Sequence, residues 1–370
     1  MKHIAVSTTI VLALLGCEDP PARDAISDDT ESDGERRPIL EIPGTAPNGD
    51  LRFASAVGAT RLSDGTIVIG DRLDRMVRFV DRQGNPRRTV GREGEGPGEF
   101  DDIDWLGQCG PDSVFVWDAD LKRMTVIDAA GNVVATFPLP SDPSAAPPSI
   151  VSCSREGVVA FIGIPVDLGD IWKHYRAPLF LADTRGAIAR EIGEVAAFEG
   201  RPLGKIISLA LTWDRIYVGT KDSAFVDVYS LNGSHLGVVA VGASARAPTP
   251  EHYESAIDIQ VMGLGSVSDR EALKELMLGW PMPDYLPPYA ALLADPKGLL
   301  WVQISLPGDA ETWLSAIDRE GRIVADVRLP RFVSVFEVGD DYLLATYVDE
   351  GGEPFVVMYE IRAGAAAFGS

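Results

Sequence analysis

The sequence predicts an all-β protein, a six-bladed β-propeller with a helical insertion between blades four and five. Three observations predict this fold. A turn motif recurs along the chain, short apolar runs alternate with turns between its copies, and one long interval contains two stretches of helical composition. A repeat period of about 40–50 residues is typical of propeller blades, which have four strands each.

The turn motif has the form Asp-x-x-Gly and is expected to join the third and fourth strands of a blade. Glycine there can adopt the positive φ that tight turns require. Four copies match the pattern and two are degenerate: Asp81–Gly84, Asp128–Gly131, Asp183–Gly186 and Asp318–Gly321, then Ser230–Gly233 and Ile361–Gly364. Successive copies start 43 to 55 residues apart, except for one step of 88 residues.

The second repeat shows the four strands most clearly. They are expected at residues 103–109, 114–118, 123–128 and 132–138. These runs are apolar on both faces, as expected for a sheet that is packed between two other sheets.

The ends of the chain indicate how the ring closes. The last blade has three clear strands, at residues 332–338, 342–348 and 355–361, and the tail after them is a poor fourth strand. Residues 38–43 have strand character and precede the first blade. We expect them to supply the missing outer strand through backbone hydrogen bonds.

Residues 243–288 form the insertion. Residues 251–261 and 269–278 have helical composition, and Ser268 with Glu271 is expected to cap the second helix. The insertion is either a lid over the central channel or a packed ornament that plugs it.

The N-terminus has the pattern of an export signal. Residues 4–15 are apolar but too short to span a bilayer. The stretch ends in Leu14-Leu15-Gly16-Cys17, which resembles the lipobox of bacterial lipoproteins, and this resemblance implies lipidation of Cys17. Residues 1–16 would then be a signal peptide.

Residues 17–37 are expected to be a disordered acidic tether, because they contain almost no large apolar side chain. The propeller would occupy residues 38–370. The chain would be held at the membrane by acyl groups alone.

Composition excludes one class of partner. The 370 residues include 33 basic and 55 acidic side chains, for a formal net charge of −22. A nucleic-acid binder needs a basic face, so no nucleic-acid partner is expected. The same charge disfavours adsorption to anionic lipid.

Three segments resemble known propellers. Residues 118–128 resemble the core of an NHL-type repeat, and residues 91–100, GREGEGPGEF, resemble the glycine-rich loop between NHL blades. This loop and the run from Leu286 to Val302 also resemble bacterial six-bladed β-propeller lipoproteins of the TolB-like superfamily. The resemblance implies the propeller fold and an envelope location, and little chemistry.

Loop lengths favour one face of the ring for binding. The loops between second and third strands and those between blades are the long ones, and binding residues usually lie on long loops. We expect the binding residues on this face to be Asp71, Arg75, Asp118, Arg123, Trp172, His174, Tyr175 and Tyr289.

Asp71 and Asp118 each end a second strand. They either line a cation site near the axis or accept backbone N–H groups in their own turns. Arg75 and Arg123 are expected to pair with these carboxylates. His174 is expected to be a surface side chain of a recognition loop rather than a metal ligand or base.

Cys109 and Cys153 occupy the same place in adjacent repeats, 44 residues apart. An exported compartment permits disulfides, so the two are either bonded or are two buried thiols.

The sequence favours a binding module for an unknown protein, peptide or glycan of the bacterial envelope, with no catalytic residue and no cofactor. The alternative is a metal-dependent hydrolase or lactonase with a cation in the central channel, for which Ca²⁺ is the candidate. It requires acidic side chains such as Asp71, Asp118 and Asp258 to converge at the channel mouth. A third possibility resembles the NHL-type amidating lyase, which requires His ligands that this chain barely supplies.

Overall fold

The computed structural model describes residues 37–45, 52–139, 148–163, 174–242, 246–262, 267–349 and 351–361. The chain separates into two units, Met1–Gly34 and Glu35–Ser370. All the described residues lie in the second unit.

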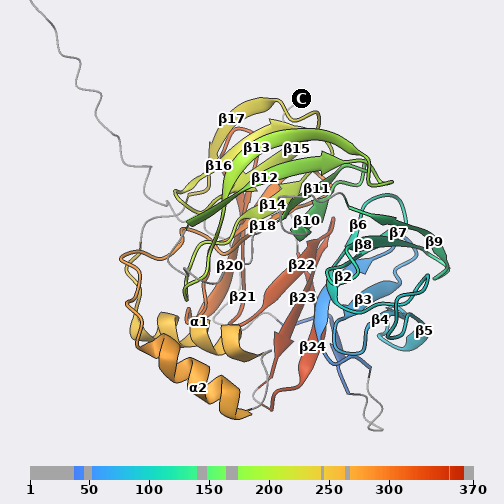
Figure 1. Cartoon of the computed structure of the whole chain (residues 1–370), viewed down its shortest axis with the longest axis horizontal. Coiled ribbons are helices and arrows are strands. Elements are labelled where there is room, and N and C mark those ends of the chain that lie inside the picture. Colours follow the sequence, from blue (N-terminus) through green and yellow to red (C-terminus); the bar gives the residue numbers. More distant parts are fainter. Residues whose placement is uncertain are drawn as a thin grey trace, which may run out of the picture. The chain divides into compact units, whose positions relative to one another are not determined.

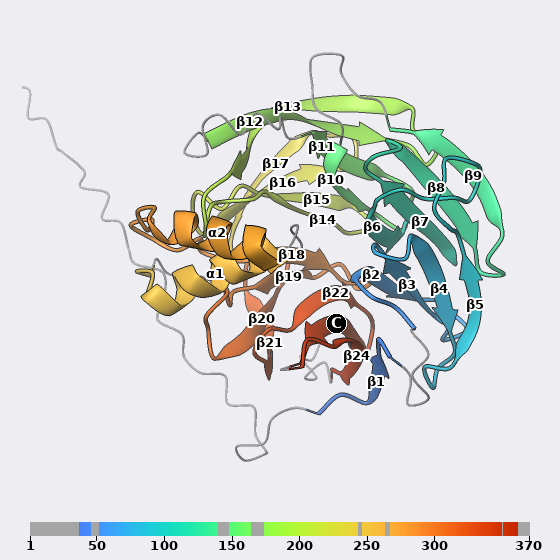
Figure 2. The same ribbon diagram turned by 60° about the horizontal axis from the view of Figure 1, so that its bottom comes forward.

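This unit contains six sheets of four strands, which form a ring (Figures 1 and 2). The strands of blades one to three are β2 (Ala56–Arg61), β3 (Ile67–Asp71), β4 (Met76–Val80), β5 (Pro86–Val90), β6 (Ile103–Gln108), β7 (Ser113–Asp118), β8 (Arg123–Asp128), β9 (Val133–Pro138), β10 (Pro148–Cys153), β11 (Val159–Gly163), β12 (His174–Ala182) and β13 (Ile188–Glu199).

The strands of blades four to six are β14 (Ser208–Leu211), β15 (Arg215–Gly219), β16 (Phe225–Ser230), β17 (His235–Ala240), β18 (Ala291–Ala294), β19 (Leu300–Gln303), β20 (Glu311–Ile317), β21 (Ile323–Pro330), β22 (Ser334–Val338), β23 (Tyr342–Val348) and β24 (Pro354–Glu360), completed by β1 (Leu40–Pro43). The predicted six-bladed, all-β fold is confirmed.

Every sheet is antiparallel, and in blades one to five its strands are adjacent in chain order. The sixth sheet has the order β1-β24-β23-β22. Its outer strand therefore comes from the start of the propeller, as predicted.

Hydrophobic clusters fill the spaces between neighbouring blades. In one of them, Val68 and Phe79 of the first blade pack with Val114 and Ile127 of the second. Similar clusters lie between the other neighbouring pairs. β3 is buried along its whole length. Burial of each such Val, Ile or Phe side chain contributes about 1.5–3 kcal/mol to folding.

The Asp-x-x-Gly motif forms the predicted turn between third and fourth strands. In the first copy, the Asp81 carboxylate accepts the N–H groups of Gln83 and Asn85, each at 2.9 Å. Gly84 N–H donates to the Asp81 carbonyl, and Gly84 has a φ of 79°. Asp183 and Asp318 hold their turns in the same way.

The insertion contains α1 (Pro250–Met262) and α2 (Val267–Leu278), close to the helices predicted. Ser268 lies inside the first turn of α2 and not at the position before it, so the prediction that Ser268 caps this helix is wrong. The helices bury Tyr253, Ile257 and Met277 in a shared cluster with loop residues of neighbouring blades.

A salt bridge and hydrogen bonds fasten the insertion to the fifth blade. Asp309, in the loop between β19 and β20, binds the Arg246 guanidinium through both oxygens, at 2.8 and 2.9 Å. It also accepts from His252 Nε2 at 3.0 Å and from Leu306 N–H at 2.7 Å.

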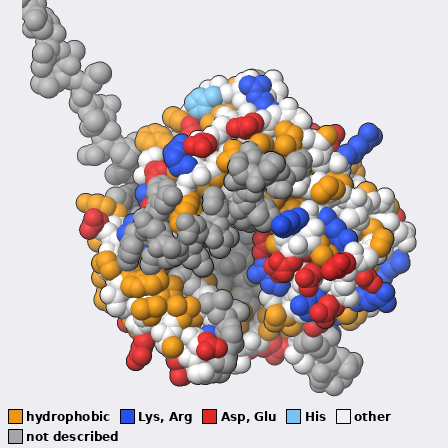
Figure 3. Space-filling view, in the orientation of Figure 1, with side chains coloured by type: hydrophobic (Ala, Val, Ile, Leu, Met, Phe, Trp, Pro, Cys, Tyr) orange, Lys and Arg blue, Asp and Glu red, His pale blue; other side chains and the backbone are white. Residues whose placement is uncertain are grey.

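Hydrophobic side chains gather on the outer surface of the insertion (Figure 3). Those most exposed are Ile259, Leu276, Leu278, Met282 and Tyr285. The insertion lies between blades four and five, on the long-loop side of the ring, so these exposed apolar side chains belong to that face. A partner on the long-loop face stays a prediction.

Candidate functional site

A cavity of about 350 Å³ lies on the axis of the propeller. The innermost strand of every blade contributes to its wall: β2, β6, β10, β14, β18 and β22. Three turns between first and second strands complete the wall, those that follow β10, β14 and β18. The cavity therefore lies towards the short-turn side of the ring, opposite the face favoured by loop length.

The propeller topology explains why the cavity exists. Each innermost strand pairs with one neighbour only, so its other edge faces the channel. Small residues on the innermost strands let neighbouring blades pack closely around the channel. A Cβ added at Gly58 would lie 2.8 Å from the Leu106 carbonyl oxygen, so only glycine lets the first two blades approach this closely.

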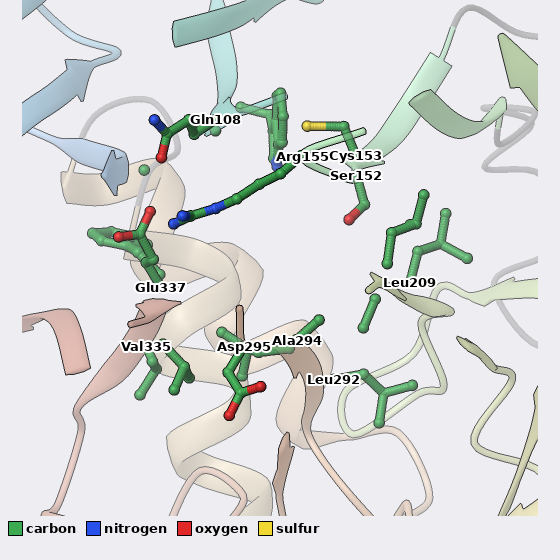
Figure 4. Close-up of a pocket in the computed structure, with 18 of the residues that line it drawn as sticks. Gln108, Ser152, Cys153, Arg155, Leu209, Leu292, Ala294, Asp295, Val335 and Glu337 are labelled. Atoms are coloured by element: carbon green, nitrogen blue, oxygen red, sulfur yellow. The ribbon is translucent and has the colours of Figure 1, made fainter. Parts of the chain in front are cut away.

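Four polar side chains enter the cavity: Gln108, Ser152, Arg155 and Glu337 (Figure 4). Arg155, in the turn after β10, extends across the cavity towards the side where Gln108 and Glu337 lie. The charge of Arg155 also acts on the Tyr342 phenol of the sixth blade. A side chain of the third blade thus influences groups of the blade on the opposite side of the ring.

The Glu337 carboxylate is held in place by three donors. Arg61 N–H donates to Oε1 at 3.2 Å, and the hydroxyls of Thr60 and Tyr342 donate to Oε2 and Oε1. Burial, and then the neighbouring negative charge of Glu337, raise the pKa of Tyr342, so its hydroxyl stays protonated as a donor.

The Gln108 amide is not saturated. Its Oε1 atom is buried and has no hydrogen-bond partner among the described residues. Buried acceptors are nearly always paired, because an unpaired one costs about 1–3 kcal/mol. Gln108 lines the cavity, so a ligand donor that reached this oxygen would remove that cost.

Asp295 also reaches the cavity wall, but its carboxylate has a structural role. Its carboxylate accepts Leu299 N–H at 2.8 Å and the indole N–H of Trp301 at 3.0 Å. Burial raises the pKa of Asp295, although these hydrogen bonds act in the opposite direction.

Trp105 supplies an aromatic wall. It is partly buried beside the cluster between blades two and three. A Cβ added at Gly107 would lie 2.4 Å from Cζ2 of this indole, so the ring lies directly over Gly107. The two residues are adjacent on one face of β6, and a larger residue at 107 would displace the ring.

The sequence-predicted residues are not brought together here. Asp71 and Asp118 are fully buried. Asp71 accepts the N–H groups of Ala54 and Ser55, and Asp118 accepts those of Asp101, Asp102 and Leu121. Both carboxylates therefore stabilise loops, and they are not available to a partner.

The predicted pairing of Arg75 with Asp71 is wrong. Asp71 pairs instead with Arg78, at 3.1 Å, while Arg75 donates to the Asp101 carbonyl at 2.7 Å. The reason is geometric. Met76 lies opposite Asp71 in the sheet, which makes Arg78 its diagonal neighbour on the same face.

The predicted pairing of Arg123 with Asp118 is also wrong. Its guanidinium donates to the carbonyl oxygens of Glu95, Gly96 and Glu99, at 2.7 to 2.8 Å. Arg123 thus clamps the glycine-rich loop. That loop has a structural role, as its sequence indicated.

The remaining candidates lie elsewhere. Tyr289 is fully buried, with its hydroxyl beside the N–H of Lys221, and Tyr175 is 6% exposed. Tyr289 is therefore not a surface residue of the predicted face. His174 begins β12. Trp172 and Cys17 lie outside the described residues.

Cys109 and Cys153 form a disulfide, with their Cα atoms 5.4 Å apart. It joins the second blade to the third at the end of β10, next to Ser152 on the cavity wall. The bond therefore restrains one side of the cavity.

The three aspartates required by a central cation site do not meet. Asp71 and Asp118 are held as described above, and Asp258 pairs with Lys274 on the insertion. Within the described ranges, no group of three or more His, Cys, Asp or Glu side chains is placed to hold a metal ion. Among the same residues, neither helix is long and apolar enough to cross a membrane.

Sequence reasoning missed Gln108, Arg155 and Glu337. One signal was present. Glu337 is a charged residue inside a mostly apolar innermost strand, for which the sequence offers no predicted partner. Nothing in the sequence around Gln108 or Arg155 distinguishes them from ordinary residues at the end of a strand and in a turn.

No known family model matches the chain, and no curated protein sequence matches it. The fold is shared with solved structures. A protein from Bacteroides fragilis that is provisionally named as exported is 12% identical, with 88% of this chain and 97% of that chain covered and a TM-score of 0.50.

Two further solved structures match the chain at lower similarity. The calcium-binding protein regucalcin from Agrobacterium tumefaciens is 11% identical over 84% of this chain and 92% of its own, with a TM-score of 0.48. A gluconolactonase from Xanthomonas campestris is 10% identical over 90% and 99%, with a TM-score of 0.45. At these identities the likeness shows the fold alone.

Proposed function

We propose that this chain is an exported, lipid-anchored binding module that holds a small solute, or the end of a peptide or glycan chain, in its central cavity. The observation that carries the proposal is the axial cavity, with Arg155 extending into it and an unsatisfied Gln108 oxygen on its wall. A rigid cavity with a few converging polar groups is the usual form of a small-molecule site.

The size of the cavity limits the ligand. Small-molecule pockets usually measure about 300–1,000 Å³, and this one lies at the lower end of that range. A folded protein cannot enter the cavity, whereas a small solute or the last one or two units of a peptide or glycan chain can. All six blades would contact such a ligand. Because the blades are closely packed against one another, the cavity is rigid.

The export part of the proposal rests on the N-terminal sequence. Residues 1–16 have the pattern of a lipoprotein signal, and Cys17 would carry the acyl groups. The disulfide between Cys109 and Cys153 agrees with an oxidising compartment. In bacterial cells, Cys17→Ser should abolish labelling with a palmitate analogue and release the chain from the membrane fraction. Continued labelling of the variant would contradict this part.

Binding is tested by filling the cavity. The Ser152 hydroxyl points into it, so Ser152→Phe should occupy the space. The melting temperature of the full chain is measured against a panel of sugars, amino acids and short peptides. At least one compound should raise the melting temperature of the wild type and leave Ser152→Phe unchanged, because a ligand stabilises the state that binds it.

Ser223→Phe is the matched control, since Ser223 is exposed on a loop between β15 and β16. It should respond like the wild type. An equal response of wild type and Ser152→Phe would place the ligand outside the cavity and contradict the proposal.

The hydrolase or lactonase alternative is not proposed. It depended on Asp71, Asp118 and Asp258 at one point near the axis, and these carboxylates are committed to separate partners.

A further inference from the structure

The donors and acceptors of the cavity wall identify a class of ligand, on the basis of the function proposed above. A carboxylate has about four acceptor positions, and three of those on Glu337 are already occupied by Thr60, Arg61 and Tyr342. One position is left for a ligand. Gln108 Oε1 supplies a second free acceptor.

Arg155 supplies the donors. Among the described residues it forms no ion pair, and its guanidinium carries five N–H donors. The Ser152 hydroxyl can donate or accept. The wall therefore offers one cation, two single acceptor positions and one hydroxyl, all converging on the same small space (Figure 4).

The charge balance disfavours an anion. Besides Arg155, the wall carries three carboxyl groups, those of Glu156, Asp295 and Glu337. A free anion would meet more negative than positive charge. A cation would meet the Arg155 guanidinium, which extends across the cavity, so a ligand without net charge avoids both repulsions.

A zwitterion, such as an amino acid, fits less well than a neutral polar ligand. Its ammonium group brings three donors to one place. Glu337 and Gln108 offer two free positions, so the third ammonium donor is left to the Ser152 hydroxyl or is buried without a partner, at a cost of about 1–3 kcal/mol. Hydroxyl groups avoid this cost, because each donates once and also accepts.

We propose that the cavity binds a saccharide: a neutral ring whose hydroxyls donate to Gln108 and Glu337 and accept from Arg155. The Trp105 indole, which lies over Gly107 on the same wall, suits the apolar C–H face of a sugar ring, since the aromatic face carries partial negative charge. A cavity of about 350 Å³ accommodates a mono- or disaccharide unit.

The test is calorimetric titration of the full chain. The sugar probes are glucose, galactose, N-acetylglucosamine and cellobiose, and the competing probes are glycine, glutamate, lysine and inorganic phosphate. At least one sugar should bind, with an affinity that falls about tenfold in Gln108→Leu, the loss expected for one hydrogen bond. Arg155→Met should weaken the same sugar by a similar or larger factor.

Arg155 is an exposed turn residue, so its replacement should not impair folding. Arg185→Met is the matched control, since Arg185 is exposed in the turn between β12 and β13, outside the cavity. It should bind the sugar like the wild type.

The titration separates failure of the saccharide proposal from failure of the proposed binding function. Binding of an amino acid or phosphate that Arg155→Met abolishes, without sugar binding, would overturn the saccharide proposal and leave the binding function standing. Sugar binding that is equal in the wild type, Gln108→Leu and Arg155→Met would also overturn it. Absence of any binding to these probes and to the wider panel would overturn both.

Discussion

Leu40 of β1 lies opposite Met358 of β24, in an antiparallel pair that joins the start of the propeller to its last strand. Glu41, Ile42 and Pro43 continue the pairing. The ring is thus closed by backbone hydrogen bonds between segments that lie more than 300 residues apart in the sequence. Its closure should be among the determinants of stability.

Ile42→Ala should lower the free energy of unfolding by about 2–5 kcal/mol, the usual cost of removing a buried Ile side chain. Ile42 is fully buried between the sixth and first blades. Urea denaturation measures the change. Ile39→Ala is the control, because Ile39 is 59% exposed and should cost little. Equal effects of the two substitutions would mean that β1 does not contribute to closure.

The disulfide between Cys109 and Cys153 should stabilise the fold. Replacing both residues with alanine should cost about 2–4 kcal/mol, the typical contribution of a disulfide. Denaturant unfolding with and without a reductant measures it. The reductant should destabilise the wild type and leave the double variant unchanged. An unchanged wild type would show that the two thiols are not bonded in solution.

Asp309 should make stability depend on acid pH. Burial acts to raise its pKa, but hydrogen bonds from Arg246, Leu306 N–H and His252 outweigh this and lower the pKa to about 2. The unfolded chain takes up this proton near pH 4, about two units higher. The stabilising contribution is therefore complete above pH 5 and is lost as the pH falls towards 2.

The difference in unfolding free energy between the wild type and Asp309→Asn should thus be largest above pH 5 and shrink between pH 4 and 2. Asp340→Asn, at an exposed turn, is the control. A difference that does not change with pH would mean that the carboxylate charge of Asp309 contributes nothing.

Lys221 should make stability depend on pH in the alkaline range, where stability again rises with pH. Its side chain is nearly fully buried, and this burial lowers its pKa from about 10.5 to about 8. Between these two pH values the unfolded chain holds a proton that the folded chain has released. Stability linked to Lys221 therefore rises as the pH increases from 8 to 10.5.

The unfolding free energy of the wild type, relative to Lys221→Met, should increase over that range and stay constant below it. Thermal or urea unfolding at several pH values measures the difference. Lys297→Met controls for the loss of an exposed lysine. A flat difference from pH 8 to 10.5 would contradict the burial of a charged group at this position.

The fold could be predicted from the sequence because its turns and strands depend on residues that are close together in the chain. The Asp81 and Asp128 turns depend on contacts within five residues, so their motif is visible in the chain itself. Buried strands such as β3 and β7 are short continuous apolar runs. Closure by β1 could be predicted because the last blade lacked an outer strand.

The cavity could not be predicted in the same way. Gln108, Arg155 and Glu337 belong to the second, third and sixth blades, and only the ring brings them together. Loop length indicated the opposite face. Long loops show where a scaffold usually presents binding residues, but they do not show where its axis is open. The Asp71 pairing failed for a local reason, since the pleat of the sheet places Arg78 on its face and Arg75 elsewhere.

The most direct test is a crystal structure of the full chain grown with the sugar that binds most tightly in the titration. We expect electron density for one sugar unit in the axial cavity, with its hydroxyls within hydrogen-bond distance of Gln108, Arg155 and Glu337. Density for the sugar on the outer surface of α1 and α2, with the cavity occupied by water alone, would contradict it.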